Sequence, residues 1–257
     1  MNRNILTQTA LTIAFGLLPA AAHDFVLTSA TDAGKQTTVT GLYGHPGAWN
    51  APDLRRLIAL DLHTGDKDEP LSILEKAMVP KSSALKLEAP VADLEESGYA
   101  AITAIYDNGF WVSTTGGKYY STTKKEASGK ITIKKSSRNM KLAKVLIRGE
   151  DRALGHRLEI VLRKPPSDLA AGAKVPVMVV FDGKALESAE LAIVPLDGVL
   201  NHDTPGTKTD AMGMAELPLG KTGTYVIRVS HDVPSKDTEM ADIDSFSATL
   251  VFDVEPD

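Results

Sequence analysis

Residues 175–184, VPVMVVFDGK, decide the fold class, because a run of apolar and β-branched residues ends there in an Asp-Gly pair. β-Branched residues favour strands, and Asp-Gly favours the two-residue turn of a β-hairpin. A second apolar run follows, so the stretch predicts a hairpin between Val175–Phe181 and Ala189–Pro195. Further strands are expected towards the C-terminus at Met214–Leu217, Thr224–Ser230 and Ser245–Val254.

The N-terminal part has the same character, with short runs of β-branched or alternating apolar residues separated by Gly, Asn, Asp and Pro. These runs are Asp24–Ser29, Lys35–Tyr43, Arg56–Leu62, Tyr99–Tyr106, Lys130–Ile133, Val145–Ile147 and Arg157–Leu162. Strands at such spacing, with turn signals between them, are typical of β-sandwiches. We therefore expect an all-β protein made of two β-sandwich units, with Arg138–Leu146 as a possible helix or helical turn.

A domain boundary is expected near Lys164–Ser167, because Pro165 and Pro166 are incompatible with a central strand pair. This divides the chain into a β-rich domain at 23–164 and an immunoglobulin-like sandwich at 165–257. The second unit has the order strand, Asp-Gly-Lys turn, strand, Thr-Asp turn, strand and Gly-Thr-Tyr strand. That order resembles the transthyretin-like and collagen-adhesin-like sandwiches, and the resemblance concerns the fold alone.

Residues 1–22, MNRNILTQTALTIAFGLLPAAA, have the organisation of a cleaved secretory signal peptide. A short polar start with Arg3 precedes an apolar run that is too short to span a bilayer, and small residues follow it. We expect cleavage before His23 or one residue earlier, so that this histidine is the first or second residue of the mature chain. The mature protein is then exported to a periplasm, with no transmembrane segment.

Composition excludes several classes of site. The 257-residue chain has no cysteine, which rules out disulfides, Cys-zinc sites, iron–sulfur clusters and thiol nucleophiles. Its net charge of −5 argues against a nucleic-acid partner. No Gly-rich phosphate loop, HExxH or GxSxG motif occurs. We therefore expect a protein that is not an enzyme.

Charge is distributed unevenly along the sequence. Lys118–Arg148 contains ten basic residues and one acidic residue, whereas Asp232–Asp257 contains eight acidic residues and one lysine. Two interpretations stay open: two solvated faces that attract each other, or a basic surface for an anionic partner. We expect the basic segment to lie largely on the surface as strands and loops.

A transition-metal site in a chain without cysteine must use histidines, carboxylates and the N-terminus. A free α-amine beside the His23 imidazole can chelate one ion, and nitrogen ligands suit Ni(II), Cu(II) and Zn(II). Three further histidines are candidate ligands: His45 in a Gly-rich turn, His156 at the entry to a strand, and His231 at the end of one. The predicted metal residues are therefore His23, His45, His156 and His231.

Several segments, taken in chain order, carry a resemblance that spans essentially the whole mature chain. They are Ala22–Leu27, Ile105–Thr115, Lys124–Ala127, Lys141–Lys144, Leu154–Val161, Asp182–Lys184, Thr209–Asp210 and Ser247–Leu250. Together they resemble a family of periplasmic proteins known as a domain of unknown function and as accessory proteins of nickel or cobalt uptake. The chain departs from that pattern at Val26, where the family has an aromatic residue, and at Leu162, where proline is common.

The resemblance implies an exported β protein that binds or delivers a divalent metal, Ni or Co, for an uptake system, with a membrane metal transporter as partner. Two alternatives stay open. One is a non-catalytic adhesion module that binds a protein or a glycan, for which Phe110-Trp111 and Tyr119-Tyr120 offer stacking surfaces. The other is a mononuclear copper enzyme, which needs a second histidine held rigidly beside His23.

Overall fold

A computed structural model describes residues 23–33, 36–65, 69–79, 87–91, 94, 98–198 and 206–255. The described chain is nearly all β, which confirms the expected fold class. The expected signal peptide, residues 1–22, and His202 lie outside the described residues.

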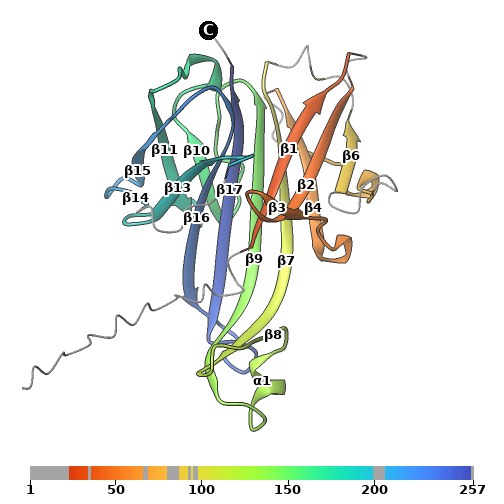
Figure 1. The fold of residues 1–257 in the computed structure, drawn as a ribbon, viewed down its shortest axis with the longest axis vertical. Coiled ribbons are helices and arrows are strands. Elements are labelled where there is room, and N and C mark those ends of the chain that lie inside the picture. The colour runs from red at the N-terminus through yellow and green to blue at the C-terminus, as the bar shows by residue number, and fades with distance from the viewer. Residues whose placement is uncertain are drawn as a thin grey trace, which may run out of the picture.

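A long central sheet organises the molecule (Figure 1). Its spatial order is β14 (Thr207–Lys208), β13 (Glu190–Pro195), β16 (Gly223–Pro234), β17 (Ile243–Val254), β9 (Ile133–Arg148), β7 (Ala100–Thr114), β4 (Leu57–Thr64) and β5 (Leu71–Ser72). The short strand β8 (Tyr119–Tyr120) pairs with β7. Strands β9 and β17 are parallel neighbours, so residues from the two halves of the sequence meet in one sheet.

Two smaller sheets pack on this central sheet. One contains β1 (Asp24–Thr31), β2 (Thr37–His45), β3 (Ala48–Asn50) and β6 (Leu87–Val91). The other contains β10 (Leu158–Leu162), β11 (Lys174–Phe181), β12 (Lys184–Ala185) and β15 (Met214–Pro218). In Figure 1 they lie on either side of the long strands.

Side chains that alternate between the two faces of each central strand explain this layering. On β17, Phe246 and Leu250 face a core shared with β10 and β11, whereas Val251 faces a core shared with β1. Successive residues of a strand point to opposite faces, so β17, which is buried at every position from Ala248 to Phe252, is covered on both. Each fully buried Leu, Ile or Phe contributes about 1.5–3 kcal/mol by its removal from water.

Helical structure is confined to single turns in the described ranges: η2 (Leu54–Arg56), η3 (Leu74–Lys76), α1 (Lys124–Ala127) and η4 (Pro166–Asp168). None of these turns has the length or the hydropathy of a membrane-spanning helix. A capping box fixes the start of α1, since the Thr123 hydroxyl accepts from the Glu126 amide while the Glu126 carboxylate accepts from the Thr123 amide.

The expectation of a helix at Arg138–Leu146 is wrong. This segment lies inside β9, between β7 and β17, and the ladder hydrogen bonds on both sides require an extended backbone. The hairpin prediction is half right. Asp182 and Gly183 have φ values of 48° and 74°, as a type I′ turn requires, but they join β11 to β12, and β13 belongs to the central sheet.

The domain division at residue 164 stays a prediction about folding units, to which the structure adds two facts. Strands β10 and β11, on either side of Pro165 and Pro166, pair with each other from Leu158↔Phe181 to Leu162↔Val177. The parallel β9–β17 pairing also continues the central sheet from the first half of the chain into the second.

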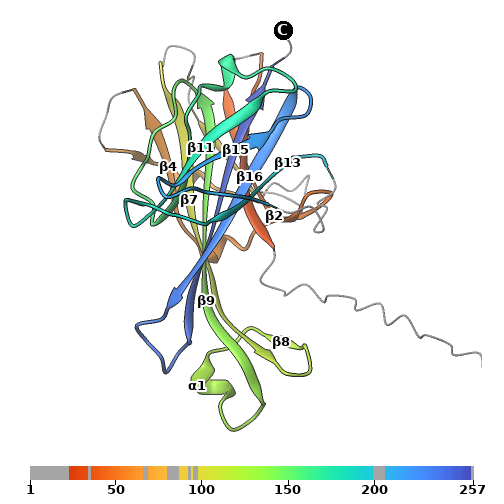
Figure 2. The ribbon, with the colours of Figure 1, turned by 90° about the vertical axis from the view of Figure 1, so that its left-hand side faces the viewer.

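The basic and acidic segments meet in the extension that carries α1 and β8, where the long strands project beyond the small sheets (Figure 2). Three exposed ion pairs join them: Lys124–Asp242 at 2.5 Å, Lys125–Glu239 at 3.0 Å and Lys135–Asp232 at 2.9 Å. The interpretation as two mutually attractive faces is confirmed for these pairs. The expected surface position is wrong for Lys141 and Lys144, which are both buried.

Candidate metal centre

The β1–β2 hairpin brings His23 and His45 together. Partners in this antiparallel pair run from Thr31↔Thr37 to Asp24↔Gly44, and one further step places His23 opposite His45. Cross-strand neighbours have Cβ atoms about 4.5–5.5 Å apart, close enough for their side chains to touch. The two imidazole rings do touch, with centroids 4.8 Å apart and planes at 71°.

This separation suits two ligands of one metal ion. An imidazole nitrogen lies about 2.0–2.1 Å from a bound transition metal, so two such nitrogens on one ion are at most about 4.2 Å apart. With the metal between them, the ring centroids are then no more than roughly 6.5 Å apart. The observed 4.8 Å lies within that limit, so the separation of the rings is compatible with two imidazole ligands on one transition-metal ion.

A tight turn holds His45 at the end of β2. Pro46 and Gly47 lie between His45 and its partner Ala48, and Gly47 has a φ of 82°, as the third position of a type II turn requires. Gly44 precedes this turn with a φ of 144°, and a Cβ at that position would lie 2.3 Å from the Ala48 carbonyl oxygen. The backbone around His45 therefore depends on glycine, and the turn presents the imidazole from a fixed position.

Aromatic side chains pack beside the His23–His45 pair. Tyr43 contacts the His23 ring edge-on, with centroids 5.3 Å apart, and Tyr106 lies 5.5 Å from Tyr43 and stacks on Phe25 at 5.0 Å. The Tyr43 hydroxyl donates to Asn108 Oδ1 at 3.0 Å. Burial raises the pKa of Tyr43 to about 12, so at neutral pH this phenol is a hydrogen-bond donor rather than an anionic ligand.

Three contacts fix the start of β1 on the central sheet. Lys141 Nζ, on β9, donates to the His23 carbonyl oxygen, and the Thr249 hydroxyl, on β17, donates to the Phe25 carbonyl at 2.7 Å. Asp24 Oδ2 lies 3.1 Å from a guanidinium nitrogen of Arg228. Burial lowers the pKa of Lys141 to about 8, which marks this amine as a buried anchor rather than a surface charge.

His231 does not lie with His23. It pairs with Phe246 across β16 and β17, on the face of the central sheet that β11 covers. Its ring packs against Phe181 of β11, with centroids 4.6 Å apart. The structure therefore places this candidate ligand in an aromatic cluster on the opposite face from Lys141 and His23.

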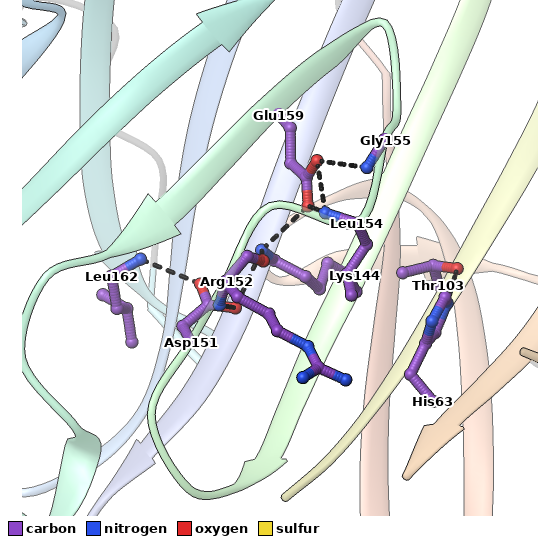
Figure 3. A network of polar contacts seen from close by, with 9 residues as sticks. All are labelled: His63, Thr103, Lys144, Asp151, Arg152, Leu154, Gly155, Glu159 and Leu162. Atoms are coloured by element: carbon purple, nitrogen blue, oxygen red, sulfur yellow. Dashed lines mark hydrogen bonds and ion pairs between the residues drawn. The ribbon is translucent and has the colours of Figure 1, made fainter. Parts of the chain in front are cut away.

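His156 follows Gly155, which belongs to a different group of polar residues, centred on Lys144 (Figure 3). Lys144 Nζ, on β9, contacts Asp151 at 2.9 Å and Glu159 at 3.2 Å, and all three side chains are at most 4% exposed. Asp151 accepts the Leu162 amide, and Glu159 accepts the amides of Leu154 and Gly155. These bonds tie the loop between β9 and β10 to the sheet.

The protonation of His156 is predicted to weaken the fold in acid. Burial, with Lys144 nearby, lowers its pKa to about 4, against about 6.5 in an unfolded chain. Between these values the unfolded chain holds more protons, so the free energy of unfolding falls as the pH drops from 7 to 4. We expect His156 to account for about 2 kcal/mol of this loss, after allowance for screening of its partly exposed ring.

The check is urea unfolding of wild type and His156→Gln at several values of pH in this range. The carboxylates titrate in both proteins, so the difference between the two curves isolates the histidine. The curve of the variant should be flatter, and parallel curves would contradict the assignment.

Sequence reasoning selected His23 and His45 separately but missed that they face each other, and it missed Lys141 and Asp24 as anchors. The described residues contain no group of three or more His, Asp or Glu side chains placed for one metal. Side chains thus supply two imidazoles, and a third nitrogen on the same ion would have to come from the main chain at His23.

The comparisons with known proteins give a family without an assigned role. No curated protein matches the chain. The family model of DUF4198, a domain of unknown function, matches residues 20–233 and so covers both small sheets and most of the central sheet. The chain therefore belongs to the DUF4198 family.

Proposed function

We propose that this protein binds one divalent transition-metal ion through His23 and His45, and that it does so as an exported periplasmic protein serving metal uptake. Cleavage before His23 would add the α-amine as a third nitrogen on the same ion. The observation that carries the proposal is the pair of imidazoles 4.8 Å apart at the start of β1.

The surroundings of the pair favour binding over a purely structural contact. Lys141 and Thr249 hold the main chain on either side of Asp24, so the backbone that carries the His23 ring is held in place before any ion arrives. Preorganised ligands bind metals more tightly because less motion is lost on binding. Neither His156 nor His231 belongs to this site in the proposal.

Nitrogen donors set the expected order of affinity. A site of imidazole and amine nitrogens binds divalent ions in the order Co(II), Ni(II), Cu(II), with Cu(II) tightest. Delivery of Ni or Co therefore requires that free copper be scarce in the compartment where the protein acts. A membrane transporter that accepts the ion is the partner that this role implies.

The test is calorimetric titration of untagged protein that begins at His23, with CoCl2, NiCl2 and CuCl2 in turn. One ion per chain is expected, with affinity that rises with pH because the donors must lose protons to bind. A matched protein with one additional alanine before His23 should differ strongly in affinity or coordination geometry if the amine is a ligand, since the α-amine is then one residue further from the imidazole. Absence of saturable binding by all three ions would contradict the proposal.

A second candidate function is a mononuclear copper enzyme, and the second imidazole beside His23 is the observation that favours it. Its test is oxygen consumption by copper-loaded protein in the presence of ascorbate. A rate above that of the same concentration of free copper, lost in the His45→Ala variant, would support it. A rate no greater than that of free copper would leave metal binding without catalysis.

A further inference from the structure

A groove of about 470 Å³ lies on the central sheet beyond the start of β1. Its lining includes Trp111 of β7, Tyr119 of β8, Ser137 and Asn139 of β9, and Ser245 of β17. Trp111 pairs with Ser137, and Ser245 pairs with Asn139, so these side chains share one face of the sheet. Lys141, the anchor of His23, follows Asn139 on that face.

Asn139, a residue of the groove lining, has a hydrogen-bond donor that is unused within the described residues. Its side chain is buried, with the residue 5% exposed, and its amide nitrogen has no hydrogen-bond partner within the described part of the chain. Buried polar groups are nearly always hydrogen-bonded, because leaving one unpaired costs about 1–3 kcal/mol. A ligand with an acceptor at the floor of the groove would remove this cost.

The rest of the lining combines aromatic rings with hydroxyl groups. Trp111 Nε1 already donates to the Asn108 carbonyl at 3.0 Å, so the indole offers the groove its apolar ring. Ser113, Thr114, Ser137 and Ser245 add hydroxyls, and among the described lining residues the charged ones are Lys134 and Lys135. Lys135 is paired with the Asp232 carboxylate at 2.9 Å. The volume of the groove lies in the range of small-molecule sites.

We propose that this groove binds a carbohydrate. A sugar ring has apolar faces of C–H groups that pack on Trp111 and Tyr119, and a rim of hydroxyls that bond to serine, threonine and amide groups. One hydroxyl oxygen of the sugar accepts from Asn139 Nδ2. This site is separate from the metal proposal, and neither depends on the other.

The groove takes one aromatic residue from each of the two pairs expected for stacking, Trp111 and Tyr119. Phe110 pairs with Arg138, whose guanidinium lies 5.8 Å from the Phe110 ring centre, and it lines a different hollow with Arg55 and Arg56. Phe110 is therefore a matched control: an aromatic residue next to Trp111 in sequence but outside the groove.

The experiment uses the fluorescence of Trp111. The chain has two tryptophans, so a Trp49→Phe background leaves Trp111 as the sole indole and places the signal in the groove. The probes are tetrasaccharides of β-1,4-glucose, α-1,4-glucose, N-acetylglucosamine and galacturonic acid, each titrated to about 10 mM because single-site sugar affinities are weak. At least one probe should give a saturable change.

In the same background, Tyr119→Ala and Asn139→Ala should each weaken that probe about tenfold, and Phe110→Ala should leave the affinity within about twofold. Tyr119 lies in a peripheral two-residue strand, so its replacement should not disturb folding. If circular dichroism shows that the Asn139 variant does not fold, the Tyr119 variant still tests the proposal. The proposal is overturned if no probe gives a saturable change, or if the Tyr119 variant binds as tightly as its parent.

Discussion

Replacement of Lys144 by methionine is expected to lower the free energy of unfolding by about 3–5 kcal/mol. Lys144 is the only cation that contacts Asp151 and Glu159 in the described ion pairs, and both carboxylates are almost fully buried. Methionine has a similar length but no charge, so two buried carboxylates lose their counterion. Urea unfolding at pH 7 measures the effect.

The matched control is Lys125→Met. Lys125 also pairs with a carboxylate, that of Glu239 at 3.0 Å, but the two side chains are 68% and 75% exposed. Exposed pairs contribute only about 0–1 kcal/mol because water screens them, so this variant should unfold nearly as the wild type does. Equal losses in the two variants would show that burial does not set the energy of the Lys144 network.

Loss of either imidazole from the candidate metal centre should lower Ni(II) and Cu(II) affinity by about 100-fold or more. Removal of a group that merely orients a metal ligand commonly costs 10–100-fold, and removal of the ligand itself costs at least as much. His23→Ala and His45→Ala are therefore expected to have similarly large effects in competition titrations with a chromophoric chelator.

His231→Ala is the control for that pair, because this histidine packs on Phe181 on the other face of the central sheet. Its affinity for metal should match that of the wild type. A large loss in His231→Ala with little change in His45→Ala would move the site away from the start of β1.

Most strand positions could be predicted from the sequence, because apolar alternation and turn residues act locally. Asp107–Gly109 shows where local signals fail. Its composition favours a turn, and the predicted strand therefore ended at Tyr106. In the structure β7 continues to Thr114 through a bulge, where pairing passes from Asp107↔Met140 to Gly109↔Asn139 and Gly109 has a φ of 76°.

Pairing over long distances could not be predicted in the same way. The parallel contact of β9 with β17 joins segments about a hundred residues apart, and it depends on how two apolar faces are covered rather than on any short motif. The same pairing makes Arg138–Leu146 a strand, although its lysines, leucines and alanine are compatible with a helix.

Part of the candidate metal centre could be predicted from the sequence. Strands were expected at Asp24–Ser29 and Lys35–Tyr43, only a few residues apart. Pairing of these two strands as a hairpin would have brought position 23 near the end of the second strand, and the observed register, which includes Asp24↔Gly44, places it opposite position 45. The anchors Lys141 and Thr249 were not accessible to this reasoning, since they come from β9 and β17 in the distant part of the chain.

The central claim is that His23 and His45 bind the same ion, and pulsed electron paramagnetic resonance of the Cu(II)-loaded protein tests it most directly. The method detects the remote nitrogen of each imidazole bound to copper. Protein that begins at His23 should show two coordinated imidazoles, and the His45→Ala variant should show one. A single imidazole in the wild type, or the same count in both proteins, would contradict the shared site.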